Sequence, residues 1–303
     1  MKNLKVSIVG FGNIGRALAH LLINSDKYCF EINVIDPSSS IEGSILDIGH
    51  AAMLKGSAEI ILNDWSFLNE SEFIFHCVGV GVPMGASRLD IAGQNIKLTI
   101  AIFKDFKPKV DSKIIVISNP DDVISHFNYL STGLSPEKVI GTGTLLDSAR
   151  MNYYISKVIK HKKDFKAILL GEHGQSIAMI NSISKIDGEP IDMVLSQDDI
   201  GRCLSNVKTA AHKIKMTQGS SIYGAVDCAV FIMESILEDS QDVLPLSNLL
   251  TQNLSELFKT KPLYMSVMSR ITKEGCFPIE NVKYYPQEIE AMQNCAKVIG
   301  QFL

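Results

Sequence analysis

A glycine-rich turn near the N-terminus constrains the fold of this 303-residue chain more than any other feature. The turn, Gly10-Phe11-Gly12-Asn13-Ile14-Gly15, directly follows the short apolar run 4–9, and apolar residues at helical spacing come after it. The next apolar run, 31–35, ends at Asp36, about 20 positions beyond the last glycine of the turn. This order is typical of a βαβ unit that binds a dinucleotide.

Each conspicuous residue of the turn has a predicted physical role. Gly10 would permit the tight turn, Gly12 would let the backbone approach a pyrophosphate, and Gly15 would let the helix pack on the strand. Asp36 would accept hydrogen bonds from a ribose diol and would repel a 2'-phosphate. The predicted cofactor is therefore NAD rather than NADP.

Apolar runs and helical segments continue to alternate through the first half of the chain. Further strands and helices are predicted at 73–78, 114–118 and 139–140, and at 90–106 and 122–130, respectively. Such alternation predicts an α/β fold, a Rossmann doubly wound parallel sheet with helices on both faces. We expect residues 1–143 to form the NAD-binding domain and residues 144–303 to form a smaller α+β catalytic domain.

The second half carries weaker patterns. Strands are predicted near 167–170 and 179–186, with a turn at Asp187-Gly188, and a helix is predicted over 286–303 with Pro286 in its first turn. The helical segment 223–236 is strongly apolar, which is typical of core and also suits a subunit interface.

A candidate catalytic set follows the predicted parallel sheet. Leu146-Asp147-Ser148-Ala149-Arg150 supplies a carboxylate and a guanidinium, and Gly171-Glu172-His173-Gly174 supplies an imidazole. A proton carrier, a carboxylate that orients it and a cation that binds a carboxylate suit reversible oxidation of a hydroxyl beside a carboxylate. Taken singly, His173 also fits a turn or core residue, and Asp147 with Arg150 also fits a helix-surface ion pair.

Two further loops are candidates because ligands collect at the carboxyl ends of parallel strands. Asn119, before Pro120, ends the predicted strand 114–118, although Asn-Pro is also a common plain turn. The glycine-containing loop from Gly79 to Arg88 suits a lid that brings Arg88 to a reacting carbonyl on closure. An isolated arginine at the start of a helix also suits a solvated surface charge.

Composition excludes several other classes of protein. With 46% hydrophobic residues, 20% charged residues and a net charge of -4, the chain suits a globular domain without a nucleic-acid-binding face. The six cysteines form no Cys-x-x-Cys pair and the seven histidines show no metal-ligand spacing, so no metal site is expected. Neither a signal peptide nor an apolar membrane span is evident, so we expect a cytoplasmic protein that does not contact the membrane.

Taken together and in this order, the motifs resemble the NAD-dependent L-lactate and malate dehydrogenase family. The resemblance also covers 139–150 and 218–224, and it thins after Leu246. Within the family, the stretch 141–147 and Met151 look most like L-lactate and L-2-hydroxyisocaproate dehydrogenases. The resemblance implies a homodimer or homotetramer that acts on a small 2-oxo or 2-hydroxy acid.

The resemblance also implies a division of labour among the motif residues. His173 would exchange the hydroxyl proton, Asp147 would orient the His173 ring, and Arg150 would bind the substrate carboxylate. Arg88 would polarise the ketone oxygen, and Ser221 would help to orient the substrate. The residues expected at the cofactor are Gly10, Gly12, Asn13, Ile14, Gly15, Asp36, Gly79 and Asn119, the last of which would also contact substrate.

One position departs from the family pattern. Counting back from Arg88 without gaps, Val82 occupies the position that holds Gln in typical lactate enzymes and Arg in typical malate enzymes. A second substrate carboxylate would meet no cation at Val82, so oxaloacetate should be a poor substrate and an apolar, branched 2-oxo acid becomes plausible. Malate dehydrogenase and a non-catalytic NAD-binding sensor remain as alternatives, and the retention of His173 and Arg150 disfavours the sensor.

Overall fold

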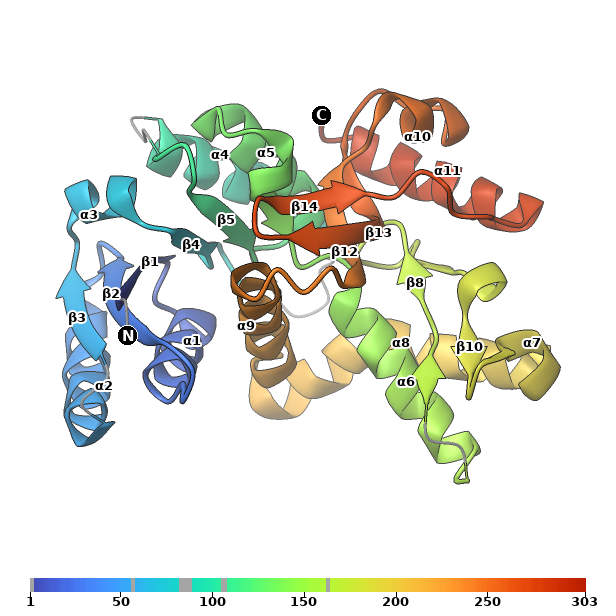
Figure 1. Cartoon of the computed structure of the whole chain (residues 1–303), viewed down its shortest axis with the longest axis horizontal. Coiled ribbons are helices and arrows are strands. Elements are labelled where there is room, and N and C mark those ends of the chain that lie inside the picture. Colours follow the sequence, from blue (N-terminus) through green and yellow to red (C-terminus); the bar gives the residue numbers. More distant parts are fainter. Residues whose placement is uncertain (1–2, 56–57, 82–88, 105–107, 162–163) are drawn as a thin grey trace.

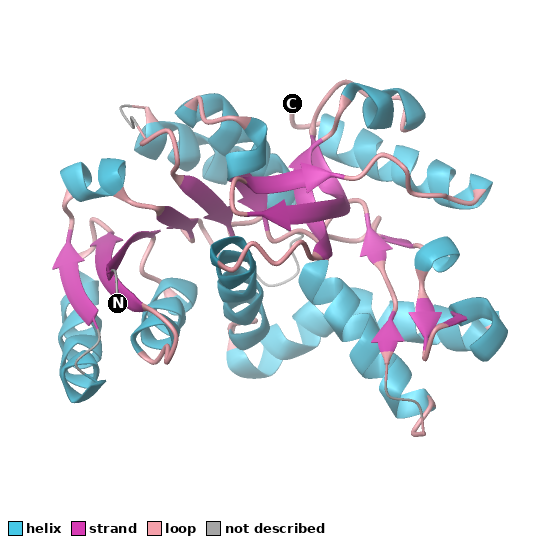
Figure 2. Ribbon diagram, in the orientation of Figure 1, coloured by secondary structure: helices cyan, strands magenta, loops and turns pink. Residues whose placement is uncertain are grey.

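The computed structural model describes residues 3–55, 58–81, 89–104, 108–161 and 164–303. A nine-stranded sheet runs through the molecule in the order β14-β13-β12-β6-β5-β4-β1-β2-β3. Helices surround this sheet along its length (Figure 2). The first six strands in the chain are β1 (Asn3–Val9), β2 (Cys29–Ile35), β3 (Ala58–Leu62), β4 (Phe73–His76), β5 (Lys113–Val116) and β6 (Val139–Gly141).

Strands β1 to β6 pair in parallel, which confirms the predicted doubly wound parallel sheet. The strand order reverses at β1, because β2 lies on one side of it and β4 on the other. The loops that follow β1 and β4 therefore diverge at their carboxyl ends, which is where open α/β sheets bind ligands. Gly10 follows β1 directly at this position.

Helices cover both faces of the parallel sheet, with α1, α2 and α9 below it and α4 and α5 above it in Figure 1. Alternate residues of a strand point to opposite faces, so one strand supplies both cores. In β1, Ile8 joins the core that includes residues of α1 and α9, whereas Val9 joins the core that includes residues of α4 and α5. The helices of the first half are α1 (Asn13–Ile23), α2 (Glu42–Lys55), α3 (Trp65–Glu70), α4 (Ala92–Phe103), α5 (Asp121–Thr132) and α6 (Leu145–Val158).

The second half extends the same sheet with three antiparallel strands that the sequence patterns did not predict. These are β12 (Val243–Leu249), β13 (Tyr264–Thr272) and β14 (Gly275–Pro278). β12 pairs with β6 through Ser247 and Gly141. The end of β6 therefore lies between β5 and β12, although β12 follows about a hundred residues later in the chain. This pairing positions the segment after β6 at the candidate site.

The predicted strand over 179–186 is wrong as a single element. The structure has β9 (Ala178–Met179), a 3₁₀ turn over Asn181–Ile183 and β10 (Lys185–Ile186). The Ser184 hydroxyl donates to the backbone oxygen of Ile180 at 2.6 Å and so competes with strand pairing in this segment. The predicted turn is confirmed, since Asp187 and Gly188 both have positive φ, at 48° and 83°.

The remaining small strands are β7 (Phe165–Lys166), β8 (Leu169–Leu170) and β11 (Glu189–Pro190), and the remaining helices are α7 (Ile191–Val194), α8 (Gln197–Gln218), α9 (Tyr223–Leu237), α10 (Gln252–Leu257) and α11 (Pro286–Gly300). The helix predicted from Pro286 is confirmed and ends at Gly300. None of the described helices is by itself long and apolar enough to cross a bilayer; α8 and α9 reach that threshold only when taken together, across a bend of 118°.

Candidate active site

The three residues of the predicted catalytic set lie in direct contact. His173 Nδ1 lies 2.5 Å from Asp147 Oδ2, and Arg150 Nη1 donates to Asp147 Oδ1 at 3.0 Å. The side chains of His173 and Arg150 are each 11% exposed and that of Asp147 is 7% exposed. Since the carboxylate accepts, Nδ1 carries a proton and the neutral ring has its lone pair on Nε2. This tautomer is the one that can take a proton from a substrate hydroxyl.

Helix α6 explains how the carboxylate and the guanidinium meet. Asp147 and Arg150 are three residues apart and therefore share one helical face. Asp147 lies in the first turn of α6, where the helix dipole favours a negative charge. The Ser148 hydroxyl of the same helix accepts a hydrogen bond from Leu169 N at 3.0 Å, which ties α6 to the strand that leads towards His173.

A small cavity of about 60 Å³ opens at these residues. Four residues predicted from the sequence contribute to its wall: Asn119, Arg150, His173 and Ser221. Ser221 lies between α8 and α9, and its hydroxyl accepts a hydrogen bond from Arg150 Nη2 at 3.0 Å. The chain thus brings together side chains from the segment after β5, α6, the segment after β8 and the α8–α9 turn.

Asn119 presents an unusual polar atom to this region. Its Oδ1 is buried and has no hydrogen-bond partner among the residues that the structure describes. Burying a carbonyl oxygen without a hydrogen-bond partner costs free energy. This oxygen is therefore a good acceptor for an N–H or O–H group of a bound ligand. The donor set beside it, an amide, a guanidinium and an imidazole, fits a small oxygen-rich acid and a nicotinamide ring.

Asn95 of α4 is a functional candidate that the sequence patterns did not reveal. Its amide donates to the backbone oxygen of Asn119 at 2.6 Å and accepts from Val80 N at 2.8 Å. A Cβ on Gly79 would lie 3.0 Å from Asn95 Nδ2. Asn95 therefore fixes Asn119 relative to the segment after β4. The sequence feature that could have revealed Asn95 is its position as a polar residue on the inner, buried face of a helix.

The glycine turn has the geometry expected of a dinucleotide site. Gly10 has φ +93°, and a Cβ on Gly15 would lie 2.2 Å from the backbone oxygen of Gly10. Around Gly12, by contrast, a Cβ would meet no atom of the described residues within 4 Å, which leaves space beside the backbone for a ligand. Asp36 accepts from Phe11 N at 2.7 Å, which places its carboxylate at the turn. These residues fit NAD.

Asn13 and Ile14, also expected at the cofactor, differ in environment. Asn13 Nδ2 donates to Ser220 Oγ at 3.2 Å and so connects the glycine turn to the loop that carries Ser221. Ile14 packs against the hydrophobic core below the sheet. The structure thus brings the glycine turn and the α8–α9 turn together, while the side chain of Ile14 contributes to folding.

Val82 and Arg88 lie outside the described residues. Their expected roles at the substrate side chain and at the reacting carbonyl therefore stay predictions.

A buried carboxylate contacts the backbone of His173. Asp122 Oδ2 accepts from the backbone N–H of His173 at 2.9 Å, and Oδ1 accepts from Ser247 Oγ at 2.6 Å. Burial raises the pKa of the Asp122 carboxyl to about 7. In the sequence, Asp122 appears only as a helix-start residue after Asn119-Pro120, so nothing pointed to His173 as its partner.

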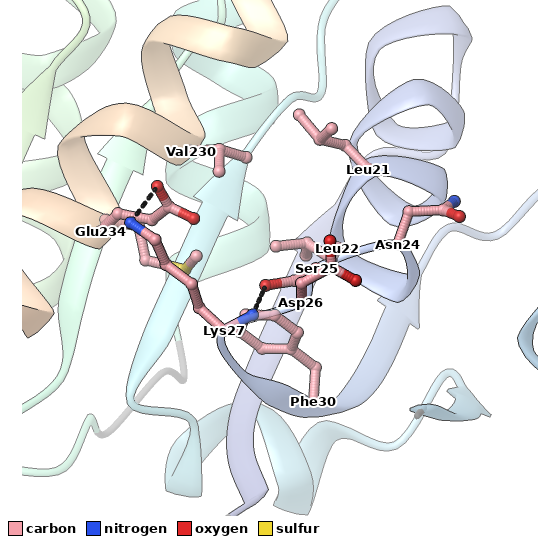
Figure 3. Close-up of a pocket in the computed structure, with 10 residues that line it drawn as sticks. Leu21, Leu22, Asn24, Ser25, Asp26, Lys27, Phe30, Val230 and Glu234 are labelled. Atoms are coloured by element: carbon pink, nitrogen blue, oxygen red, sulfur yellow. Dashed lines mark hydrogen bonds and ion pairs between the residues drawn. The ribbon is translucent and has the colours of Figure 1, made fainter. Parts of the chain in front are cut away.

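A second cavity, of about 240 Å³, lies between α1 and α9 (Figure 3). Its wall holds Lys27, whose Nζ lies 3.7 Å from Glu234 Oε2, among apolar residues of both helices. None of the predicted site residues lines it. Within the described ranges, no group of three or more His, Cys, Asp or Glu side chains could hold a metal ion.

Comparisons with known proteins agree along the whole chain. Residues 4–141 match the NAD binding domain of lactate/malate dehydrogenase, and residues 144–301 match the alpha/beta C-terminal domain. An L-lactate dehydrogenase of Clostridium botulinum is 30% identical over 259 residues, covering 81% of this chain and 80% of that protein. A probable L-lactate dehydrogenase of Schizosaccharomyces pombe is 29% identical, covering 98% and 92%.

Similar solved structures include enzymes of both names. A lactate dehydrogenase from a Medee basin deep-sea metagenome library has a TM-score of 0.87 and 26% identity, covering 100% of this chain and 98% of its own. Malate dehydrogenase of Cryptosporidium parvum has a TM-score of 0.88 and 26% identity, covering 99% and 98%. The cofactor is NAD, as the matched NAD-binding domain and the glycine turn indicate. The chain belongs to the lactate/malate dehydrogenase family and is an NAD-dependent 2-hydroxy acid dehydrogenase.

Proposed function

We propose that this enzyme interconverts an L-2-hydroxy monocarboxylic acid and its 2-oxo acid, in the manner of an L-lactate dehydrogenase. The observation that carries the proposal is the contact of Asp147 with both His173 and Arg150 at one cavity. NAD, when bound, accepts the hydride during oxidation and returns it during reduction. The residues of the chain handle the proton and the carboxylate.

His173 is the proposed proton carrier. In oxidation its Nε2 takes the hydroxyl proton, and in reduction the imidazolium returns it. Asp147, 2.5 Å from Nδ1, stabilises the imidazolium and holds the ring in the reactive tautomer. Because the His173 side chain is only 11% exposed, bulk water is largely excluded from the proton transfer.

Arg150 is the proposed carboxylate clamp. Two of its N–H groups are engaged by Asp147 and Ser221, and a guanidinium has five, so donors remain for a bidentate pair with the substrate. Ser221 fixes the plane of the guanidinium from the opposite side. Asn119 Oδ1 would accept a hydrogen bond from the ligand, and Arg88 would polarise the ketone oxygen.

The preference for a monocarboxylic acid rests on the charges around the substrate. Among the described residues that line the cavity, Arg150 is the only one with a permanent positive charge, and the carboxylate shared by all 2-oxo acids would occupy it. Val82 adds no charge at the position that distinguishes lactate from malate enzymes. A second carboxylate would be desolvated without a partner. The likeness of 141–147 to L-2-hydroxyisocaproate dehydrogenases extends the proposal to larger, branched acids.

We further propose that residues 1–143 form the NAD-binding domain, residues 144–303 form the catalytic domain, and the chain assembles as a homodimer or homotetramer. Three exposed apolar residues of α2, Leu46, Met53 and Leu54, support assembly, since they are 61%, 81% and 89% exposed. Sedimentation equilibrium of the protein and of a Met53→Lys/Leu54→Lys variant would test it. The variant is expected to dissociate, and a monomeric wild type would contradict assembly.

The proposed reaction is tested by the decrease in NADH absorbance with pyruvate, 2-oxoisocaproate, phenylpyruvate and oxaloacetate. A higher kcat/KM for a monocarboxylic acid than for oxaloacetate is expected. Preference for oxaloacetate would favour the malate dehydrogenase alternative. Tight NADH binding without turnover of any of the four acids would favour the non-catalytic sensor.

A further inference from the structure

Asp121 is a buried carboxylate in the wall of the candidate active site. It is the first residue of α5 and is 1% exposed. Its Oδ2 accepts from Thr142 Oγ1 at 2.9 Å, and its Oδ1 accepts from Gly143 N at 3.2 Å. Both partners line the same cavity as Asp121 itself. One carboxylate therefore holds the short segment that follows β6.

The surrounding backbone leaves room for this carboxylate. A Cβ on Gly141 would lie 2.3 Å from Asp121 Oδ1, so a side chain at that position would displace the carboxylate. A Cβ on Gly143, which has φ +56°, would lie 2.6 Å from the backbone nitrogen of Ser247. The segment 141–143 is thus fixed between α5 on one side and β12 on the other.

The arrangement is electrostatically costly. Asp121 lies beside Asp122, and burial followed by the charge of Asp122 raises its pKa well above the usual range. The helix N-terminus and two hydrogen bonds offset part of the cost. An apolar side chain at this buried position would avoid the cost, although it could not hold Thr142 and Gly143.

We propose that Asp121 is a positioning residue for the reaction, acting through Thr142 and Gly143 to fix the cavity wall between Asn119 and Arg150. The expected effect on kcat/KM rests on the proposed function. Nicotinamide and substrate would pack against this wall, so a displaced wall would weaken both cofactor binding and turnover. Thr142 is the intermediary, since it lines the cavity and its hydroxyl donates to Asp121.

A double-mutant cycle tests the proposal. Asp121→Leu removes both acceptor oxygens and Thr142→Val removes the hydroxyl, so each breaks the link with a side chain of similar size. Each is expected to lower kcat/KM and to weaken NADH binding, measured by fluorescence, by roughly 10- to 100-fold. If the residues act through one another, the double variant loses little more than either single variant. Asp198→Leu, the same change at an exposed aspartate of α8, is the matched control and should leave both constants unchanged.

Thermal unfolding distinguishes positioning from folding. Lowered stability with wild-type kinetic and binding constants would overturn the proposal, as would losses that simply add in the double variant. If the wild type turns over none of the four acids, only the proposed reaction is rejected. The double-mutant cycle measured by NADH binding still tests the role of Asp121. Wild-type NADH affinity in both single variants would reject the role of Asp121.

Discussion

Asp147 holds His173 by a hydrogen bond of 2.5 Å between Oδ2 and Nδ1, across 26 residues of sequence. The other carboxylate oxygen of Asp147 contacts Arg150 at 3.0 Å. One buried carboxylate therefore contacts both the proposed proton carrier and the proposed carboxylate-binding guanidinium. Removing the charge of Asp147 should lower the rate of the chemical step far more than it weakens NADH binding.

Asp147→Asn is expected to lower kcat by about 10⁴-fold, because an amide can present N–H to Nδ1 and so stabilise the unreactive tautomer. NADH affinity should stay within about twofold of the wild type. Stopped-flow and fluorescence titration measure the two quantities. A loss of NADH binding equal to the loss of turnover would show that Asp147 serves the cofactor site instead.

Arg150→Lys should mainly weaken binding of the 2-oxo acid. Lysine keeps the charge but loses the planar fork that contacts Asp147, Ser221 and the substrate together. Loss of one charge-assisted hydrogen bond of the fork costs about 1.5–3 kcal/mol, or roughly 10- to 150-fold in kcat/KM. Ser221→Ala, which removes one contact of the guanidinium, should cost less. Equal activity of Arg150→Lys and wild type would contradict a bidentate clamp.

Two alanine substitutions separate the two roles of the glycine turn. Gly12→Ala should leave the melting temperature nearly unchanged and raise the Kd for NADH, because its Cβ meets no protein atom but points where the cofactor approaches. Gly15→Ala should lower stability by about 1–3 kcal/mol, because its Cβ would lie 2.2 Å from Gly10 O. Calorimetry and NADH titration of both variants give the comparison. Strong destabilisation by Gly12→Ala would contradict this assignment.

Stability should depend on pH through Asp122. Burial raises the pKa of its carboxyl to about 7 in the folded protein, whereas an unfolded aspartate titrates near 4. Its contribution to stability is therefore full below about pH 4 and is lost as the pH rises through about 7. The negative charges of Glu172 and Asp147 act in the same direction as burial, whereas the neighbouring Asp121 has its own pKa raised well above the usual range by burial and by the charge of Asp122.

Asp122→Asn removes this titration. The difference in unfolding free energy between variant and wild type should shift in favour of the variant from pH 4 to pH 7. Urea unfolding at several pH values measures it, with Asp198→Asn as the exposed control. A difference that does not change with pH would show that Asp122 titrates normally.

Local patterns were enough to predict the parallel sheet and the grouping of Asp147, Arg150 and His173. The glycine turn, Asp36 and the alternating elements are encoded within short segments, and His173 and Asp147 lie in recognisable motifs. The roles of Asp121 and Asp122 were not predictable in this way. Asp122 contacts Ser247 across 125 residues, and no short segment carries that information.

The sheet extension shows the same limit. β12 is a recognisable apolar segment, but its antiparallel pairing with β6 depends on Ser247 meeting Gly141, and register over long separations is set by tertiary packing. The strand predicted at 179–186 failed for a local reason, because the Ser184 hydroxyl bonds to the backbone of Ile180.

Replacement of His173 by glutamine tests the central claim most directly. The variant should bind NADH with wild-type affinity by fluorescence titration, yet oxidise it with the preferred 2-oxo acid at least about 10³-fold more slowly, because the proton carrier is gone. Turnover of the His173→Gln variant at the wild-type rate would contradict the assignment of His173 as the group that exchanges the substrate proton.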